Sequence, residues 1–302
     1  MSAPVISHPD AVVLAQDPLR AIGWMLASGL CFVGVTGIVR HLGTELPAAQ
    51  SAFLRFVWGV IILAPALLAV CRTGVTRGLW RLYLGRGALH VGAVICWFYA
   101  MARIPVAEVT AIGYLNPVLL TIGTAMFLGE KLALRRMVAI GVALLGALIV
   151  LRPGLRELTQ GHLSQVLAAC LFAGSYLFAK KLSGLVSAGQ SVAMLSVVVT
   201  VGLLPLAIAV WVPVSMVQIA WLALVAAFAT GGHYGMSRAF AAAPVAVSQP
   251  VVFLQLIWAT ALGALVFGEA VDPFVLLGGG VIVASVSYIT WREAVLRRAR
   301  AV

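Results

Sequence analysis

Long runs without a charged side chain set the pattern of this chain. Residues 182–237 contain no Asp, Glu, Lys or Arg, and the same holds for residues 239–268, 109–129 and 21–39. These runs are apolar all round, whereas the strands of a membrane barrel alternate over about ten residues. A helix needs about 20 apolar residues to cross a bilayer. The pattern therefore predicts an all-α membrane protein.

Short connections separate the predicted helices, and several of them are marked by proline, glycine or charge. We place ten transmembrane helices at residues 20–39, 48–70, 80–101, 105–128, 134–151, 163–182, 190–211, 215–238, 244–267 and 273–291. Connections this short leave no room for a separate soluble domain.

An internal repeat divides the chain into two halves, residues 1–157 and 158–302, with five predicted helices each. A shift of 139 residues aligns the Pro-Val-Ala segments at 105–107 and 244–246, and Gly129-Glu130 with Gly268-Glu269; a shift of 140 aligns Phe32 with Phe172 and Gln50-Ser51 with Gln190-Ser191. Because five is odd, the second half enters the membrane from the opposite side. Inverted repeats of this kind are typical of secondary transporters, which bind cargo near the midplane between the halves.

The composition agrees with this topology. Hydrophobic residues make up 63% of the chain and charged residues 10%, where a soluble domain has about 25% charged residues. The net charge is +11. With the N-terminus inside, most of the basic residues flank the cytoplasmic ends of the helices, so we expect both termini in the cytoplasm of a bacterial-type inner membrane. The basic excess then needs no nucleic-acid partner. Asp10 and Asp17 precede the first helix in place of a basic region, so we expect no cleaved signal peptide.

Several motifs resemble the EamA family of the drug/metabolite transporter superfamily. They are Phe127-Leu128-Gly129-Glu130 and Phe267-Gly268-Glu269 at two helix ends, Arg55 within Phe53-Leu54-Arg55-Phe56, and a glycine-rich last helix in each half. The resemblance covers nearly the whole chain. It implies a secondary carrier with alternating access for a small amphiphilic metabolite, with export of an aromatic amino acid as the first expectation. Import of a flavin-, nucleobase- or S-adenosylmethionine-like compound is the alternative.

Polar side chains inside the predicted helices mark a candidate substrate site, because polar groups at membrane depth are costly. His90 and Trp97 lie on one face of the third helix, and Asn116 coincides with Gln255 under the 139-residue shift. The predicted substrate-binding residues are Arg55, His90, Trp97, Tyr99, Tyr114, Asn116, His233, Tyr234 and Gln255, with Ser175 and Tyr176 as further candidates.

Two prolines predict helix breaks within this site. Pro117 removes a hydrogen bond from the carbonyl of Gly113, and Pro250 does the same for Ala246. Broken helices near the midplane coordinate substrate in many carriers. We therefore expect a gating role for both prolines.

Each candidate also has a structural interpretation. Arg55 either clamps an anion or pairs with helix carbonyls or Glu108. His90 either carries a proton or is a neutral buried histidine. Trp97 and Tyr99 fit a pocket or a lipid-facing surface equally well, and the amides of Asn116 and Gln255 fit a pocket or interhelical hydrogen bonds. For Glu130 and Glu269 we expect a structural role, closing helix ends or pairing with basic neighbours, and a proton site at Glu108 is an alternative.

Other classes of protein find little support. The chain has no nucleotide-binding Gly-rich loop, no His-Glu-x-x-His motif, and no metal or redox spacing among Cys31, Cys71, Cys96 and Cys170. We therefore expect no enzyme, no cofactor and no metal. The expected partners are the small-molecule cargo, the lipid bilayer and, as a candidate coupling ion, the proton. A monomer and a homodimer are both open, and a non-transporting membrane scaffold is the remote alternative.

Overall fold

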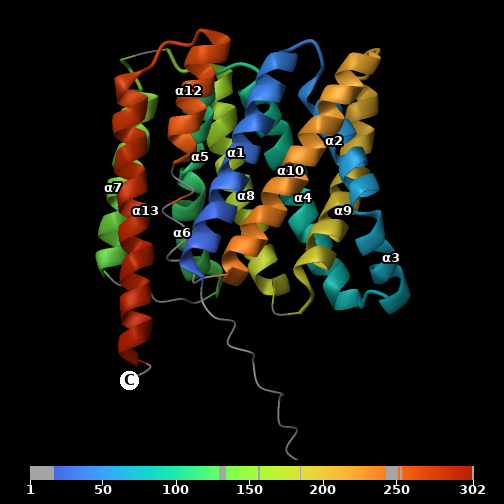
Figure 1. Cartoon of the computed structure of the whole chain (residues 1–302), viewed down its shortest axis with the longest axis horizontal. Coiled ribbons are helices and arrows are strands. Elements are labelled where there is room, and N and C mark those ends of the chain that lie inside the picture. Colours follow the sequence, from blue (N-terminus) through green and yellow to red (C-terminus); the bar gives the residue numbers. More distant parts are fainter. Residues whose placement is uncertain are drawn as a thin grey trace, which may run out of the picture.

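The computed structural model describes residues 17–128, 134–155, 157–183, 185–242, 251 and 254–300. Figure 1 shows these residues as a bundle of upright helices. The helices are α1 (Pro18–Leu42), α2 (Ala48–Ile62), α3 (Ala64–Thr73), α4 (Arg77–Met101), α5 (Val106–Gly113), α6 (Leu115–Leu128), α7 (Leu134–Leu151), α8 (Gln160–Ser183), α9 (Ala188–Ala209), α10 (Met216–Ala242), α12 (Gln255–Phe267) and α13 (Pro273–Arg300).

Every predicted transmembrane segment has a helical counterpart in the described part of the chain. There, α1, α4, α8, α9 and α10 are each long and apolar enough to cross a membrane, and α2 and α3 pass this test together as one bent pair. Shorter apolar helices cover the remaining segments. For the ninth segment only α12 and Val251 are described, because residues 243–250 and 252–253 lie outside the described ranges. The all-α membrane fold is confirmed.

The second predicted helix is not straight. The sequence predicts one helix over residues 48–70, but the structure breaks it at Leu63 and bends α3 away from α2 by 69°. Pro65 lies in the first turn of α3. Its ring lacks an N–H group and crowds the carbonyl four residues earlier, so a continuous helix would lose a hydrogen bond there.

Helices from the two halves pack as equivalent pairs. The first helix of each half packs along the third helix of the other, giving α1 with α10 and α8 with α4. The remaining large contacts, α7 with α13 and α2 with α9, also join the halves. Figure 1 shows α7 and α13 at one end of the bundle and α2 and α9 toward the other. This is the arrangement that two inverted five-helix repeats produce.

The repeat extends to single contacts between helices. A Cβ atom at Gly34 would lie 3.5 Å from the Phe228 ring, and the equivalent Gly174 would place one 2.9 Å from Leu89. At the α7–α13 crossing, a Cβ at Gly146 would lie 2.8 Å from the carbonyl oxygen of Gly278. The equivalent pair is Ser285 and Ala139, and there the hydroxyl donates to the carbonyl. Small residues let the two backbones approach in both copies.

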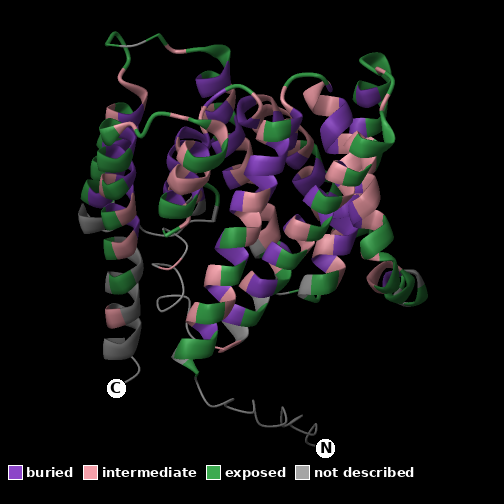
Figure 2. Ribbon diagram, turned by 45° about the horizontal axis from the view of Figure 1, so that its top comes forward, coloured by how far each residue is buried: buried purple, intermediate pink, exposed green. Residues whose placement is uncertain are grey.

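The outer surface of the bundle is apolar. Leu145, Leu148, Val201, Ile208 and Leu265 are all at least half exposed. Figure 2 shows buried residues gathered along the middle of the bundle, with exposed residues on the outside and at the lower ends. An exposed apolar surface of this extent fits contact with lipid rather than water.

The two ends of the bundle differ in their contacts. The described chain starts and ends on the same side, at the bottom of Figure 1, which we call the termini face. On the opposite side, the far face, Arg40 pairs with Glu269 at 3.0 Å and Arg152 pairs with Asp272. His162 Nε2 lies 2.6 Å from Glu108 Oε2, also at the far face. Each of these pairs joins one half to the other at the far face. Toward the termini face the halves are joined by hydrogen bonds, from the Asp17 N–H to the Ala242 carbonyl at 3.0 Å and from Arg86 to the Ser191 hydroxyl at 2.7 Å.

Candidate functional site

A cavity of about 280 Å³ lies between the two halves, and we call it the central cavity. Helices from both repeats contribute to its wall. The lining residues are Phe32 and Thr36 from α1; Arg55 and Phe56 from α2; His90, Val94, Trp97 and Phe98 from α4; Val109, Thr110 and Gly113 from α5; Tyr114 before α6 and Asn116 in it; Gln165, Ala169, Phe172 and Tyr176 from α8; Ala229, His233 and Met236 from α10; and Gln255 from α12.

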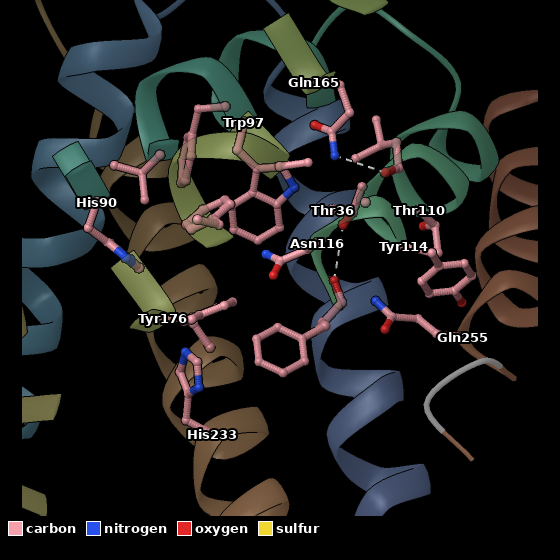
Figure 3. Close-up of a pocket in the computed structure, with 18 of the residues that line it drawn as sticks. Thr36, His90, Trp97, Thr110, Tyr114, Asn116, Gln165, Tyr176, His233 and Gln255 are labelled. Atoms are coloured by element: carbon pink, nitrogen blue, oxygen red, sulfur yellow. Dashed lines mark hydrogen bonds between the residues drawn. The ribbon is translucent and has the colours of Figure 1, made fainter. Parts of the chain in front are cut away.

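Most of the predicted binding residues meet at this cavity. Those that line it are Arg55, His90, Trp97, Tyr114, Asn116, His233 and Gln255. Figure 3 shows Trp97, Asn116 and His233 around one central space, with Gln165, Thr110 and Tyr114 along one side. The structure therefore brings together side chains that the sequence separates by up to 200 positions.

Two predicted binding residues do not line the central cavity. The Tyr99 hydroxyl donates to Gln160 Oε1 at 2.8 Å, and the Arg103 guanidinium lies 3.6 Å over the Tyr99 ring. Tyr99 is two residues past Trp97, which turns it about 200° around the helix. Tyr234 is 57% exposed and meets Trp24 edge-on, although it lines a second pocket described below.

The broken helix α5–α6 runs along the cavity wall. Helix α5 ends at Gly113, and the Tyr114 N–H donates back to the Ala111 carbonyl at 3.2 Å. Helix α6 restarts at Leu115, so Pro117 falls in its first turn. A proline costs nothing there, because first-turn N–H groups have no partner within the helix. The structure thus has a break next to Gly113. Pro250 and Glu130 lie outside the described residues.

Aromatic rings form one wall of the cavity. Phe172 and Tyr176 stack with ring centroids 6.1 Å apart and planes 17° apart, and Trp97 meets Phe172 edge-on at 5.8 Å. Across the cavity, Phe32 lies 5.2 Å from the His233 ring. Such walls favour flat ligands, because ring faces and edges both offer attractive contacts.

Hydrogen-bonding groups complete the wall. Gln165 Nε2 donates to the Val109 carbonyl at 3.0 Å, while Gln165 Oε1 is buried with no hydrogen-bond partner among the described residues. His90 Nδ1 lies 3.1 Å from the Ser175 hydroxyl. A buried acceptor without a donor is costly, so a ligand N–H or O–H at Gln165 would be stabilised.

Several residues of the cavity wall carry no signal strong enough to be predicted from the sequence. Phe32, Thr36, Thr110, Gln165 and Phe172 were not among the predicted site residues. Phe32 and Phe172 were available from the 140-residue shift, which aligns them. The 4-3-4 spacing of residues 165, 169, 172 and 176 also places these residues on one helix face.

The cavity wall is only partly symmetric. Phe32 corresponds to Phe172, Trp97 to Met236 and Asn116 to Gln255, and all six line the cavity. The cationic or titratable residues break this rule. Under the same shifts, Arg55 corresponds to Leu195, His90 to Ala229 and His233 to Val94. The aromatic and amide residues of the wall thus have counterparts in the other half, whereas each basic residue corresponds to an apolar one.

A second pocket of about 240 Å³ continues the central cavity. The two share Arg55, Phe56, His90 and His233. The second pocket also reaches Leu63 at the end of α2 and Gly189 at the start of α9, both on the way to the termini face. The space therefore extends toward the termini face, whereas the three ion pairs between the halves lie at the far face.

Arg55 stands where the two pockets meet. Its guanidinium carbon lies 4.0 Å over the Phe56 ring, and no hydrogen bond or ion pair joins Arg55 to another described residue. Glu108, a partner considered from the sequence, instead accepts from His162 at the far face.

Glu269 both pairs with a basic residue and closes a helix end. Its Oε1 accepts from Arg40 Nε at 3.0 Å, and its Oε2 accepts from the Val106 N–H at 2.9 Å, at the start of α5. A carboxylate is favourable at a helix N-terminus. Arg40 also donates to the Ala102 carbonyl, so this cluster ties α1, α5 and the end of α12 together.

Comparison with known proteins identifies the family. The family model described as the EamA-like transporter family matches residues 19–152 and again residues 159–291. A riboflavin transporter of Vibrio cholerae is 29% identical, covering 95% of this chain and 98% of that protein. A riboflavin transporter of Rhizobium johnstonii is 30% identical, covering 95% and 96%. An S-adenosylmethionine uptake transporter of Rickettsia conorii is 25% identical, covering 91% and 94%.

A solved crystal structure shares the fold. It superposes with a TM-score of 0.59 at 18% sequence identity, covering 92% of this chain and 96% of that chain. The relatives are transporters rather than enzymes, and they are bacterial membrane proteins that match along nearly their whole length. The chain belongs to the EamA-like transporter family.

Proposed function

We propose that this transporter is an alternating-access carrier for a flat heteroaromatic metabolite of the flavin type, bound in the central cavity. The observation that carries the proposal is the combination of an aromatic wall with unused amide groups between the two halves. A ring system stacked near Phe172 and Tyr176 gains apolar contact. The amides of Asn116, Gln255 and Gln165 offer donors and acceptors to the polar edge of such a ring.

The size of the cavity is compatible with a small metabolite. The central cavity alone, at about 280 Å³, lies just below the range of about 300–1,000 Å³ of typical ligand pockets. The second pocket adds space for a tail that projects beyond the ring. The riboflavin transporters among the relatives support the flavin class as the first cargo to test.

An aromatic amino acid, our first expectation from the sequence, fits the cavity less well. Its ammonium group needs a carboxylate or several carbonyl oxygens. No Asp or Glu is among the residues that line the central cavity in the described part of the chain. A neutral heteroaromatic ring needs no such partner.

The inverted repeat supports alternating access. The far face is closed by the Arg40–Glu269, Arg152–Asp272 and His162–Glu108 pairs. Rocking one half against the other would release these contacts and close the termini face by equivalent contacts. Exposed basic residues such as Arg72, Arg77 and Arg81 lie near the termini face, so we place that face in the cytoplasm. The described state is then inward-facing, and protons are a candidate for the coupling ion.

The experiment is counterflow in proteoliposomes without an ion gradient. Labelled riboflavin is supplied outside, with unlabelled riboflavin trapped inside. We expect transient accumulation of label above protein-free liposomes. Labelled phenylalanine is run in parallel. Accumulation of phenylalanine alone would replace the flavin proposal by an amino acid carrier, and accumulation of neither cargo by folded protein would refute both.

A further inference from the structure

Two arginines inside the bundle, one half-buried and one buried, have no carboxylate paired to them among the described residues. Arg55 lines both pockets. Arg86 is 7% exposed and lies one helical turn before His90 on α4. Arg86 Nη1 donates to the Ser191 hydroxyl at 2.7 Å and to the Ser191 carbonyl at 3.2 Å, while its Nε has no described partner. Neither arginine therefore has an anion beside it among the described residues.

An arginine inside a membrane protein is expensive unless an anion or water balances it. A cavity lined by one sign of charge within a low-dielectric wall concentrates the electrostatic potential. In the described lining of both pockets, Arg55 is charged, His90 and His233 are basic, and there is no Asp or Glu. The pockets therefore attract anions and repel cations.

We infer that the cargo carries an anionic group, a carboxylate or a phosphate, which binds Arg55 at the junction of the two pockets. The inference rests on the proposed carrier function, because it concerns the cargo of the same cavity. The ring of the cargo then occupies the central cavity, and its anionic tail points into the second pocket, toward the termini face.

The geometry of Arg55 suits this role. Its guanidinium carbon lies 4.0 Å over the Phe56 ring. No hydrogen bond to another described residue occupies its N–H donors, so they are available to two oxygens of a carboxylate or phosphate. Arg86, one turn from His90, adds a second positive charge on the side of the termini face. Cationic cargo, such as an amine or a sulfonium compound, finds repulsion at the same place.

Binding to the purified full-length protein in nanodiscs tests the inference, with the thermal unfolding midpoint followed by circular dichroism. Two matched pairs of probes share a ring and differ in charge: flavin mononucleotide with riboflavin, and indole-3-acetate with tryptamine. We expect each anion to bind at least roughly tenfold more tightly than its partner, the low end for a hydrogen bond to a charged group. The first pair reports on phosphate and the second on carboxylate.

Variants assign the preference to one residue. Arg55→Gln should bring the affinities within each pair to within about twofold, while Arg55→Lys, which keeps the charge but not the bidentate geometry, should retain part of the preference. The matched control is Arg103→Gln, an exposed arginine at the far face, which should keep the full preference. If Arg55→Gln does not fold, the anion preference of the wild type and its partial loss in Arg55→Lys still test the inference.

The outcomes separate this inference from the carrier function. Equal binding within both pairs by the wild type, or a full anion preference in folded Arg55→Gln, would overturn the anion site. Riboflavin counterflow with no anion preference would reject this inference alone. An anion preference without riboflavin counterflow would support the site and reject neutral riboflavin as the cargo.

Discussion

At the residue scale, the cavity places equivalent amides on opposite repeats. Asn116 and Gln255 come from different halves, yet both line the central cavity. Neither side chain makes a hydrogen bond to another described residue that would fix it in the bundle. Their amides are therefore available to a ligand. Each amide offers a carbonyl oxygen that accepts a hydrogen bond and an NH2 group that donates one.

We predict that Asn116→Ala lowers transport with little effect on folding. Loss of one neutral hydrogen bond is worth about 0.5–1.5 kcal/mol, so the affinity for cargo should fall about two- to tenfold. The measurement is riboflavin counterflow at equal protein, with the thermal midpoint as a check on folding. Gln218→Ala is the matched control, because Gln218 is half-buried and its side chain donates to Glu45 at the far face, outside the central cavity. Equal transport by Asn116→Ala and wild type would remove Asn116 from the site.

A second prediction compares a tyrosine outside the central cavity, Tyr99, with a tyrosine in the cavity wall, Tyr176. Tyr99→Phe should leave transport within about twofold of wild type, because its hydroxyl bonds Gln160 outside the central cavity. Tyr176→Ala should lower transport, because Tyr176 stacks on Phe172 in the cavity wall. Initial counterflow rates check both. The reverse order of effects would return Tyr99 to the substrate site.

Most of the residues predicted from the sequence line the central cavity, but they are a minority of its wall, and the sequence could not decide which face of a helix points inward. Polar residues within apolar helices identified Arg55, His90, Asn116 and Gln255 correctly as lining residues. Tyr99 shares the aromatic cluster of Trp97, and only the orientation of α4 separates them. Phe32 and Phe172 were overlooked because a phenylalanine in an apolar helix carries no polar signal of its own.

At the element scale, glycines decide how closely the helices of the two halves approach. A Cβ at Gly278 would lie 2.5 Å from the Gly146 carbonyl oxygen, whereas a Cβ at Gly280, two residues further along α13, would meet nothing within 4 Å. Backbone atoms cannot give way as a flexible side chain can. The α7–α13 crossing therefore depends on the first glycine and not on the second.

Gly278→Ala should destabilise the protein and Gly280→Ala should not. Overpacking costs typically about 1–3 kcal/mol, and alanine in place of an exposed helical glycine gains about 0.5–1 kcal/mol. Thermal unfolding in the same nanodiscs compares the two variants directly. Equal unfolding midpoints for Gly278→Ala and Gly280→Ala would mean that the α7–α13 crossing accommodates the added methyl group without a loss of stability.

Sequence patterns predict the number of helices better than their shape. Uncharged runs locate the ten segments because charge is the strongest signal at a membrane boundary. The bend at Leu63 is missed, because a window of apolar residues hides the effect of Pro65 on the hydrogen-bond ladder. The break next to Gly113 is found, because Pro117 was considered as a backbone element and not only as an apolar residue.

At the scale of the whole molecule, the proposed alternating access requires the far face to open. Arg40 and Glu269 lie on different halves, and their contact also closes the start of α5. Any state open to the far side must separate them. The pair therefore reports on the relative position of the halves.

A short bifunctional thiol-reactive linker should stop transport when it joins Arg40→Cys to Glu269→Cys in a chain without native cysteines. Turnover should return when the linker is cleaved. The control joins Ser215→Cys to Gln218→Cys, which lie within one half at the same face and already contact each other. Continued transport by the protein crosslinked at 40 and 269 would argue against opening at this face.

The unequal distribution of basic groups in an otherwise paired wall has a consequence for each turnover. A fully symmetric cavity would bind an asymmetric ligand equally well in two orientations. The ligand could then leave with either end first. Here Arg55 corresponds to Leu195, and His233 to Val94. A guest with distinct ends has one preferred pose, so the same end leads whenever it leaves toward the termini face and trails whenever it leaves toward the far face. The repeat allows motion in both directions, and the basic residues that occur in one half only give the cargo a fixed orientation during that motion.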